Sequence, residues 1–308
     1  MIFLEPSILR SLTPAQWQNY YQEAQAQAAQ GSLPDYIPQL QRADPSWWTV
    51  QVGDSQGKIF GAGPQNLSFP LMSVIKPFLL LYLLNLYGKN WVNQQVGMQA
   101  SSLPYHSLGQ LEQDQGFPRN AMINSGAIAL ADKLPGAQAE ERCRCLQDWL
   151  NDQAQTQLYL DQSLLNSVRS RPNAGNQALT ALLAKAGRLQ DETEALETYN
   201  QICCLTANIK DLYQLGQILL PSPTPLRGSA FVRQMMLTAG LYEESAHYAR
   251  IWGFACKSGV SGALLALLPP PPEQQGGIVV ASYSPPLAPT GHSLVGMTFL
   301  DLLASGVR

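Results

Sequence analysis

Charged residues are scarce in this sequence. They make up 13% of its 308 residues, about half the usual share, while hydrophobic residues make up 45%. Disordered chains and coiled coils are rich in charge, so the composition excludes both classes and favours a compact globular protein. The 19 Lys and Arg residues are outnumbered by 22 Asp and Glu residues, which leaves a net charge of −3. Because nucleic-acid binding relies on basic surface, we expect no nucleic-acid partner.

Long apolar runs are also missing. The longest, Pro77 to Tyr87, is interrupted by Asn85. It falls short of the roughly 20 residues that span a membrane, so we expect a buried core helix there and no membrane partner. The N-terminal segment lacks the basic region and the cleavage site of a signal peptide. The five cysteines include no CxxC pair, and their odd number favours reduced thiols over disulfides. We therefore expect a cytoplasmic protein without a metal.

Periodicity divides the chain into strands, a long helical block, more strands and a final helix. The strand-like segments are 47–53, 58–63, 251–259, 263–268 and 277–284; helical patterns dominate from 73 to about 220, and the last helix covers about 293–304. This order predicts an α+β fold, with an antiparallel sheet built from both chain ends and a mostly helical inserted lobe. We expect a sheet lobe of about 1–72 plus 222–308 and a helical lobe of about 73–221. A small-molecule site would lie in the cleft between them.

Particular residues mark helix and loop boundaries. Thr13 can cap a helix that Pro14 begins and Gly31 ends. The proline-rich stretches 221–228 and 269–277 are typical of connecting loops.

Ser73 and Lys76 form an S-x-x-K motif at the start of the helical block. Residues i and i+3 share a helix face, so the serine hydroxyl and the lysine amine can lie within hydrogen-bonding distance. Burial lowers a lysine pKa, and a neutral amine can take the proton of a serine nucleophile. Pro77 is tolerated only in the first turn of a helix, which places the pair at the helix start. By itself the motif is more typical of a capping serine followed by a lysine that reaches solvent.

Two further segments could complete an acyl-transfer site. Lys257-Ser258-Gly259 ends a strand-like segment, and the Val260 amide could join that of Ser73 as the two donors of an oxyanion hole. Asn124 begins a helix of small residues and could direct its amide into the cleft. The alternatives are a strand end with a bulge at Gly259 and an ordinary helix cap at Asn124. The order S-x-x-K, Asn and K-S-G is typical of penicillin-recognising serine enzymes.

Longer segments resemble the serine-dependent glutaminase family, whose fold is β-lactamase/transpeptidase-like. They follow the family's order and cover most of the chain from about residue 30 onward. The matching segments are DYIPQL (35–40), MSVIKPF (72–78), NAMINSGAI (120–128), ETYNQICCLT (197–206), TAGLYEES (238–245), KSGVSGAL (257–264) and SPPLAPTGHSLVG (284–296). The resemblance implies that the substrate is L-glutamine, hydrolysed to L-glutamate and ammonia through a serine acyl-enzyme.

The same resemblance implies roles for individual residues. Ser73 would be the nucleophile and Lys76 its proton acceptor. Tyr199 and Tyr242 would relay a proton to the departing ammonia, although a buried tyrosine alone is more often a core aromatic. Val260 would supply the second oxyanion amide. The family's substrate-contacting positions fall on Tyr36, Ser73, Asn124, Asn176, Tyr199, Tyr242 and Val260. The family also implies a homo-oligomer, a dimer or tetramer, and these groups require no metal or organic cofactor.

One position departs from the family pattern. Family members carry a glutamate seven residues before the asparagine matched by Asn176, where it recognises the amino group of the substrate. This chain has Arg169 there, or Val168 if one residue is inserted. An arginine that faces the site would repel the ammonium of glutamine and suit a carboxylate or a blocked amine. Alternatively, Arg169 turns to solvent and Asp161 or Glu243 takes the ammonium.

Three hypotheses therefore stand at the level of the sequence. The first is a cytoplasmic glutaminase that acts through Ser73. The second is a related serine amidohydrolase with another substrate. The departure from the family pattern at residues 168–169 is the reason for this hypothesis. The third is a non-catalytic family member that binds an amino acid or a partner protein. Retention of Ser73, Lys76 and the K-S-G segment argues against the third, and the whole set of matching motifs favours the first.

Overall fold

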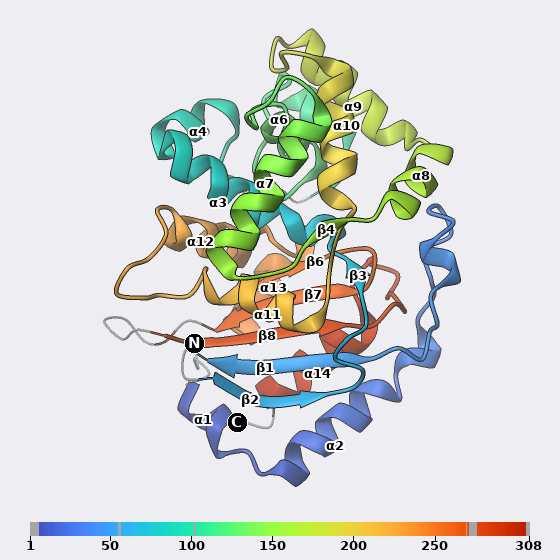
Figure 1. Ribbon diagram of the computed structural model, residues 1–308, viewed down its shortest axis with the longest axis vertical. Helices are drawn as coiled ribbons and strands as arrows, with labels where there is room; N and C mark the ends of the chain where they lie inside the picture. Colours follow the sequence, from blue (N-terminus) through green and yellow to red (C-terminus); the bar gives the residue numbers. More distant parts are fainter. Residues whose placement is uncertain (1–5, 55–56, 102, 269, 271–275, 306–308) are drawn as a thin grey trace.

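The centre of the fold is an antiparallel five-stranded sheet in the order β2-β1-β8-β7-β6 (Figure 1). The computed structural model describes residues 6–54, 57–101, 103–268, 270 and 276–305. The strands of this sheet are β1 Thr49–Asp54, β2 Gly57–Ala62, β6 Ala255–Ser258, β7 Ala263–Leu268 and β8 Ile278–Tyr283. β1 pairs directly with β8, so that Val52 lies opposite Val280. Both ends of the chain thus share one sheet, and the predicted α+β class is confirmed.

Helices fill most of the chain between β2 and β6. Near the N-terminus lie α1 Pro6–Ser11, α2 Pro14–Gln25 and the short 3₁₀ turns η1 Ala28–Gln30 and η2 Leu40–Arg42. The long middle block contains η3 Met72–Ile75, α3 Lys76–Tyr87, α4 Lys89–Gln95, α5 Leu108–Gln113, α6 Asn124–Ala131, α7 Ala139–Ala154, α8 Gln162–Ser170, α9 Ala174–Lys185, α10 Glu192–Cys203 and α11 Ile209–Gln217. The chain continues with α12 Ser229–Ala239, η4 Tyr242–Glu244 and α13 Ser245–Ile251, and α14 Leu294–Ser305 follows β8.

Apolar side chains cover both faces of the central sheet. Successive residues of a strand point to opposite faces, so Leu265 and Val279 join one hydrophobic cluster while Leu264 and Val280 join the other. α11 packs on the first face. α2 and α14 cover the second face, where Trp17, Val295 and Phe299 belong to the same cluster as Val280. The helices packed on both faces hold the sheet in place, including its edge strand β6. This strand leads to the site described below.

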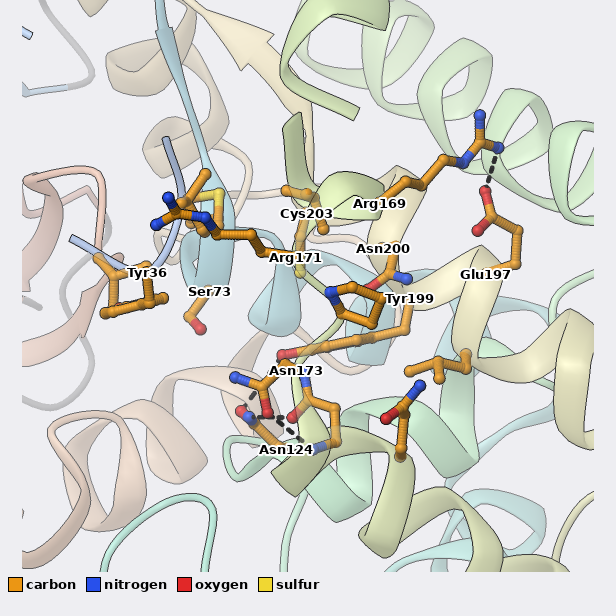
Figure 2. Close-up of a pocket in the computed structure, with 18 of the residues that line it drawn as sticks. Tyr36, Ser73, Asn124, Arg169, Arg171, Asn173, Glu197, Tyr199, Asn200 and Cys203 are labelled. Atoms are coloured by element: carbon orange, nitrogen blue, oxygen red, sulfur yellow. Dashed lines mark hydrogen bonds and ion pairs between the residues drawn. The ribbon is translucent and has the colours of Figure 1, made fainter. Parts of the chain in front are cut away.

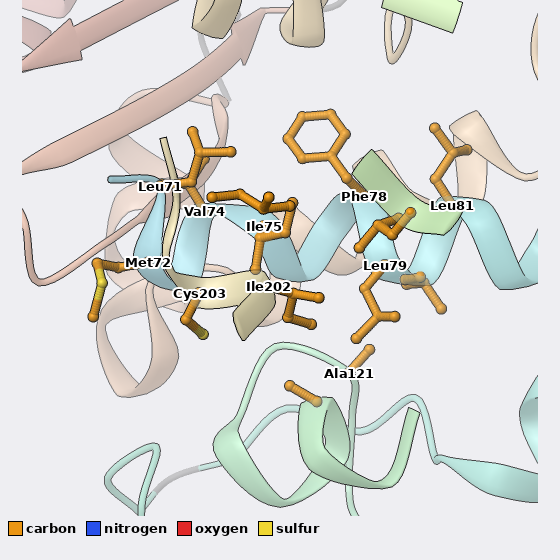
Figure 3. Close-up of a cluster of buried hydrophobic side chains, with 14 of the residues drawn as sticks. Leu71, Met72, Val74, Ile75, Phe78, Leu79, Leu81, Ala121, Ile202 and Cys203 are labelled. Carbon is orange, nitrogen blue, oxygen red and sulfur yellow. The ribbon is translucent and has the colours of Figure 1, made fainter. Parts of the chain in front are cut away.

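α3 is buried almost along its whole length. Its residues from Lys76 to Leu84 are all buried, and Figure 3 shows Phe78, Leu79 and Leu81 packed with Ile202 of α10 in one apolar cluster. A helix that is apolar all round belongs in a core. The predicted buried helix in this apolar run is therefore confirmed, and Lys76 at its start is fully buried.

Some local predictions need correction. The segment 251–259 is not a strand throughout, because α13 continues to Ile251 and β6 begins only at Ala255. A second, three-stranded sheet lies within the chain, in the order β3-β5-β4, formed by Phe69–Pro70, Leu205–Ala207 and Tyr159–Leu160. It was not predicted, because strands of two or three residues leave no periodicity to detect. The cap at Thr13 is confirmed, since its side chain accepts a hydrogen bond from the Gln16 amide.

Two further predictions are only partly open to comparison. The stretch 269–277 lies mostly outside the described residues. The division into two lobes stays a prediction. Within the described part of the chain, no helix is both long and apolar enough to cross a membrane.

Candidate active site

A cavity of about 650 Å³ gathers most of the predicted site residues. This volume suits a small ligand. Its walls come from the segment before η2, from η3, from α8 to α10 and from the turn after β6 (Figure 2). The predicted residues that line it are Tyr36, Ser73, Asn124, Val168, Arg169, Asn176, Tyr199 and Val260. Lys76 and Tyr242 are buried and reach the site through hydrogen bonds.

Ser73 sits on a strained turn between a strand and a helix. β3 ends at Pro70, and Met72 then adopts a left-handed conformation with φ of 47°. Such a conformation in a non-glycine residue costs about 1–3 kcal/mol and persists only where its surroundings impose it. Ser73 is half-buried and opens into the cavity. The turn therefore presents the hydroxyl at the start of α3, as the proline at position 77 predicted.

Lys76 is fully buried, one turn after Ser73. Its Nζ donates hydrogen bonds to Asn124 Oδ1 at 2.7 Å and to the Met122 carbonyl oxygen at 3.2 Å. Burial lowers the pKa of Lys76 from 10.5 to about 7. A substantial fraction of the amine is therefore neutral near neutral pH, as a general base requires. The Ser73 side chain is hydrogen-bonded to that of Tyr242.

Tyr242 and a second buried lysine complete the surroundings of Ser73. Lys257 is fully buried, and its Nζ donates to the Tyr242 hydroxyl oxygen at 3.0 Å. Burial lowers the pKa of Lys257 well below its usual value, and the charge of Lys76 lowers it further. Burial raises the pKa of Tyr242, which keeps the phenol protonated. The sequence analysis considered only the small residues of the K-S-G segment and did not identify the Lys257 amine as part of the site. The signal that could have identified it is a lysine between Cys256 and Ser258 on an apolar strand.

Gly259 brings the end of β6 against the turn that carries Ser73. A Cβ at this position would lie 2.5 Å from the Leu71 carbonyl oxygen and 3.4 Å from the Ser73 amide nitrogen. Only glycine tolerates such a close approach of two backbones. The next residue, Val260, lines the cavity beside Ser73. This arrangement suits two backbone amides directed at one substrate oxygen.

Asparagine side chains form the opposite wall. Asn124 Nδ2 donates to Asn176 Oδ1 at 2.8 Å, and the Tyr199 hydroxyl donates to Asn124 Oδ1 at 3.2 Å. Asn176 is held in the first turn of α9, where its backbone amide donates to the Asn173 side chain at 2.8 Å. Asn124 is the first residue of α6, and the preceding Ile123 takes the cap position. The side chain of Asn124 is thus free to link Lys76, Tyr199 and Asn176.

Comparisons with known proteins agree with this geometry. A family model described as Glutaminase matches residues 31–308. This chain belongs to the glutaminase family. It is 49% identical to a glutaminase of Synechocystis, covering 96% of this chain and 90% of that one. It is 32% identical to a glutaminase of Aeromonas hydrophila, covering 89% and 91% of the two chains. The Bacillus subtilis glutaminase YbgJ, solved as a covalent complex with 5-oxo-L-norleucine, superposes with a TM-score of 0.83 at 27% identity over 95% of this chain and 97% of that one.

These matches decide between the sequence-level hypotheses. The protein is an enzyme of the glutaminase type with the β-lactamase-like fold of the family. The hypotheses of a related serine amidohydrolase with another substrate and of a non-catalytic binding protein are therefore set aside.

The departure from the family pattern has a clear structural form in this glutaminase. Arg169 and Val168 both line the cavity. The Arg169 guanidinium turns away from Ser73 and forms an ion pair with Glu197 of α10 (Figure 2). Val168 packs against the main hydrophobic cluster. The prediction that Arg169 turns away from the reacting centre fits this arrangement, although its partner is a carboxylate rather than solvent alone.

The two acids named as replacements do not line the cavity. Asp161 caps α8, where it accepts the Leu164 amide at 2.9 Å, and Glu243 is exposed on η4. The carboxylates that do line it are those of Asp35 and Glu197. Sequence reasoning missed Glu197 because its position two residues before Tyr199 says nothing of a contact with α8. Arg171 also lines the cavity and donates to the Asp35 carbonyl oxygen at 3.1 Å.

Proposed function

We propose that this glutaminase hydrolyses the side-chain amide of L-glutamine through a covalent acyl-enzyme on Ser73. The single observation that carries the proposal is the Ser73 hydroxyl at the cavity wall, hydrogen-bonded to Tyr242, with the buried Lys257 donating to that phenol and the buried Lys76 one helical turn after the serine. Buried neutral amines are bases that work at neutral pH. Apart from water, every group needed for acyl transfer is present in the chain.

In the first half of the reaction, Lys76 accepts the proton of Ser73 as the serine oxygen attacks the amide carbon of the substrate. The amides of Ser73 and Val260 stabilise the negative charge that forms on the amide oxygen. The carbon–nitrogen bond then breaks, and Tyr242 delivers a proton so that ammonia leaves. The proton that Lys76 took from Ser73 then replaces the one lost by the phenol, which leaves Lys76 neutral for the second half. Lys257 Nζ donates to the phenol oxygen at 3.0 Å and holds it in place. Tyr199, on the opposite wall of the cavity, helps to relay the proton to the departing ammonia.

In the second half, water attacks the acyl-enzyme. Lys76 takes one proton from the water, the bond between Ser73 and the acyl carbon breaks, and the proton returns to the serine oxygen. The products are L-glutamate and the regenerated serine. The rest of the proposed substrate contacts are made by Tyr36, Asn124, Asn176, Tyr199 and Tyr242.

We further propose that Glu197 binds the ammonium of the substrate in place of the missing family glutamate. Its Oε1 accepts hydrogen bonds from Arg169 and, at 3.0 Å, from Gln201. The ion pair with Arg169 holds the carboxylate in the cavity wall. A carboxylate that binds an ammonium contributes about 1.5–3 kcal/mol.

Ammonia release from L-glutamine tests the proposed function, with wild-type protein beside Ser73→Ala. We expect the variant to lose about 10³-fold or more of kcat, since removal of a catalytic serine leaves only binding and oxyanion stabilisation. Intact mass after incubation with 6-diazo-5-oxo-L-norleucine should show one adduct on the wild type and none on the variant. Ammonia release that persists in Ser73→Ala would contradict the mechanism.

The cellular compartment and the oligomeric state also remain proposals. The five cysteines are free thiols, which supports a reducing, cytoplasmic compartment. Assembly into a dimer or tetramer rests on the family resemblance, and light scattering after size-exclusion chromatography would measure it.

A further inference from the structure

Three buried or half-buried side chains form a continuous chain of contacts behind the proposed site. Ser258, the last residue of β6, places its Oγ 2.6 Å from Nδ1 of His292. His292 Nε2 lies 3.1 Å from Oε2 of Glu244. Ser258 and His292 are each 2% exposed. The reaction described above uses none of the three residues.

The proton positions in this chain follow from the chemistry of its end groups. An ionised carboxylate can only accept hydrogen bonds, so Glu244 favours a proton on Nε2 of His292. The hydrogen bond from His292 lowers the pKa of Glu244, which keeps it ionised. Nδ1 is then the acceptor for the hydroxyl of Ser258. The orientation of the imidazole ring is thereby fixed at both ends.

The ring of His292 contacts both elements that carry the Tyr242–Lys257 pair. It stacks on the ring of Tyr242, with centroids 5.9 Å apart and an angle of 15° between planes. Tyr242 and Glu244 belong to the same 3₁₀ turn, η4. Ser258 directly follows Lys257, and its carbonyl oxygen accepts a hydrogen bond from Lys257 Nζ at 2.9 Å. His292 therefore joins η4 to β6 at the point where Tyr242 meets Lys257.

Tyr242 needs such a support. Its φ of 56° is a left-handed conformation that a bulky residue rarely adopts. A strained conformation persists only when surrounding contacts over-determine it. The stacked His292 and the turn held by Glu244 supply contacts of that kind.

We infer that Ser258, His292 and Glu244 form a positioning relay that holds the Tyr242 hydroxyl between Ser73 and Lys257. The inference rests on the proposed function of this site. His292 is a positioning residue in this scheme, since it acts on the reaction through Tyr242 and Lys257. Loss of the relay lowers kcat with little change in KM, because the other residues proposed to bind the substrate, among them Tyr36, Asn124 and Asn176, line the cavity from other elements and stay in place.

The test is a double-variant cycle with Ser258→Ala and Glu244→Ala, together with His292→Phe. His292→Phe keeps a ring for stacking but removes both polar contacts. We expect each variant to lower kcat for L-glutamine about 10- to 100-fold, as small misplacements of catalytic groups do, with KM within twofold. Because the two ends act through one ring, the double variant should lose no more than the larger single loss. Additive losses, or kcat within twofold of wild type in all three, would overturn the inference.

Two controls separate positioning from general damage. Glu244→Gln keeps an acceptor for Nε2 and should restore most of the kcat that Glu244→Ala loses. His247→Phe alters an exposed histidine on the neighbouring α13 and should leave kcat unchanged. An equal loss in Glu244→Gln or in His247→Phe contradicts a specific relay.

A spectroscopic readout makes the inference independent of turnover. Tyrosine labelled with ¹³C at Cζ gives a signal for Tyr242 that Tyr242→Phe assigns. The signal should shift in Ser258→Ala and in Glu244→Ala, even if L-glutamine is not hydrolysed. An unmoved signal refutes the relay, whereas undiminished ammonia release in Ser73→Ala refutes the proposed function.

Discussion

Replacing Lys76 with methionine should make the protein more stable and destroy its activity. Lys76 is fully buried, and its pKa falls from 10.5 to about 7 on folding. That difference corresponds to about 4–5 kcal/mol of unfavourable folding free energy near pH 7, because the amine must give up its proton to be buried. Methionine has nearly the same shape and carries no charge, so Lys76→Met removes this penalty.

The lost hydrogen bonds offset part of the gain. The amine donates to Asn124 Oδ1 and to the Met122 carbonyl oxygen. Asn124 Oδ1 keeps the Tyr199 hydroxyl as a donor, so the offset is about 1–3 kcal/mol for the Met122 oxygen. We therefore expect Lys76→Met to unfold with a free energy about 1–4 kcal/mol larger than wild type at pH 7.

The sign of the pH dependence gives a second readout. Between pH 7 and 10.5 the unfolded chain keeps the proton of Lys76 and the folded protein has lost it. Stability therefore rises with pH in this window, by about 1.4 kcal/mol per pH unit for each such lysine. Lys257 contributes in the same direction. Lys76→Met should lose its share of that slope, while the contribution of Lys257 remains.

Urea unfolding at pH 7, 7.5, 8 and 8.5 measures both quantities. The exposed lysine of α11, changed in Lys210→Met, is the matched control and should leave the stability and its slope unchanged. Ammonia release should be lost in Lys76→Met alone. A Lys76→Met protein that is less stable than wild type at pH 7, with an unaltered slope, would show that Lys76 is not held neutral by burial.

Three further predictions concern the reaction itself. The value of kcat/KM for L-glutamine should rise through about pH 7 as Lys76 loses its proton; a profile that stays flat from pH 5.5 to 8.5 rules Lys76 out as the base. Glu197→Gln should raise KM for L-glutamine about 10- to 100-fold but alter KM for 4-carbamoylbutanoate, which lacks the amino group, less than about twofold. Glu192→Gln, at the exposed start of α10, is the control, and equal effects on both substrates count against Glu197. Gly259→Ala should lower kcat about 100-fold, because its Cβ would lie 2.5 Å from the Leu71 carbonyl oxygen and displace the Val260 amide.

Local sequence patterns were sufficient for most of the fold. The cap at Thr13, the apolar run of α3 and the position of Ser73 at the start of a helix depend on residues close together in the chain. A sheet built from both chain ends followed from the order of strands and helices along the chain, whereas the pairing of β1 with β8 is known only from the structure. The burial of Lys76 could also be predicted, because an apolar run follows it in the sequence.

Contacts between distant segments could not be read in this way. Lys257 and Tyr242 are separated by a helix and a turn, and His292 lies 34 positions after Ser258. No periodicity reports that such side chains meet. The same holds for Arg169 and Glu197, 28 positions apart. The sequence identified the missing family glutamate, but the choice of Asp161 and Glu243 as replacements was wrong because it had no geometry to rest on.

The residues that break local rules are gathered around Ser73. Among the described residues, the non-glycine positions with positive φ are Met72, Gln115, Gln155 and Tyr242. Gln115 and Gln155 lie just after helices, where such a conformation is common. Met72 instead directly precedes Ser73, Tyr242 is hydrogen-bonded to Ser73, and the site also contains the two fully buried lysines Lys76 and Lys257. Each of these features destabilises the fold, so their occurrence together indicates that the fold holds them for the reaction. Substitutions chosen only to relieve strain or buried charge should therefore raise stability at the expense of hydrolysis, as Lys76→Met would show first.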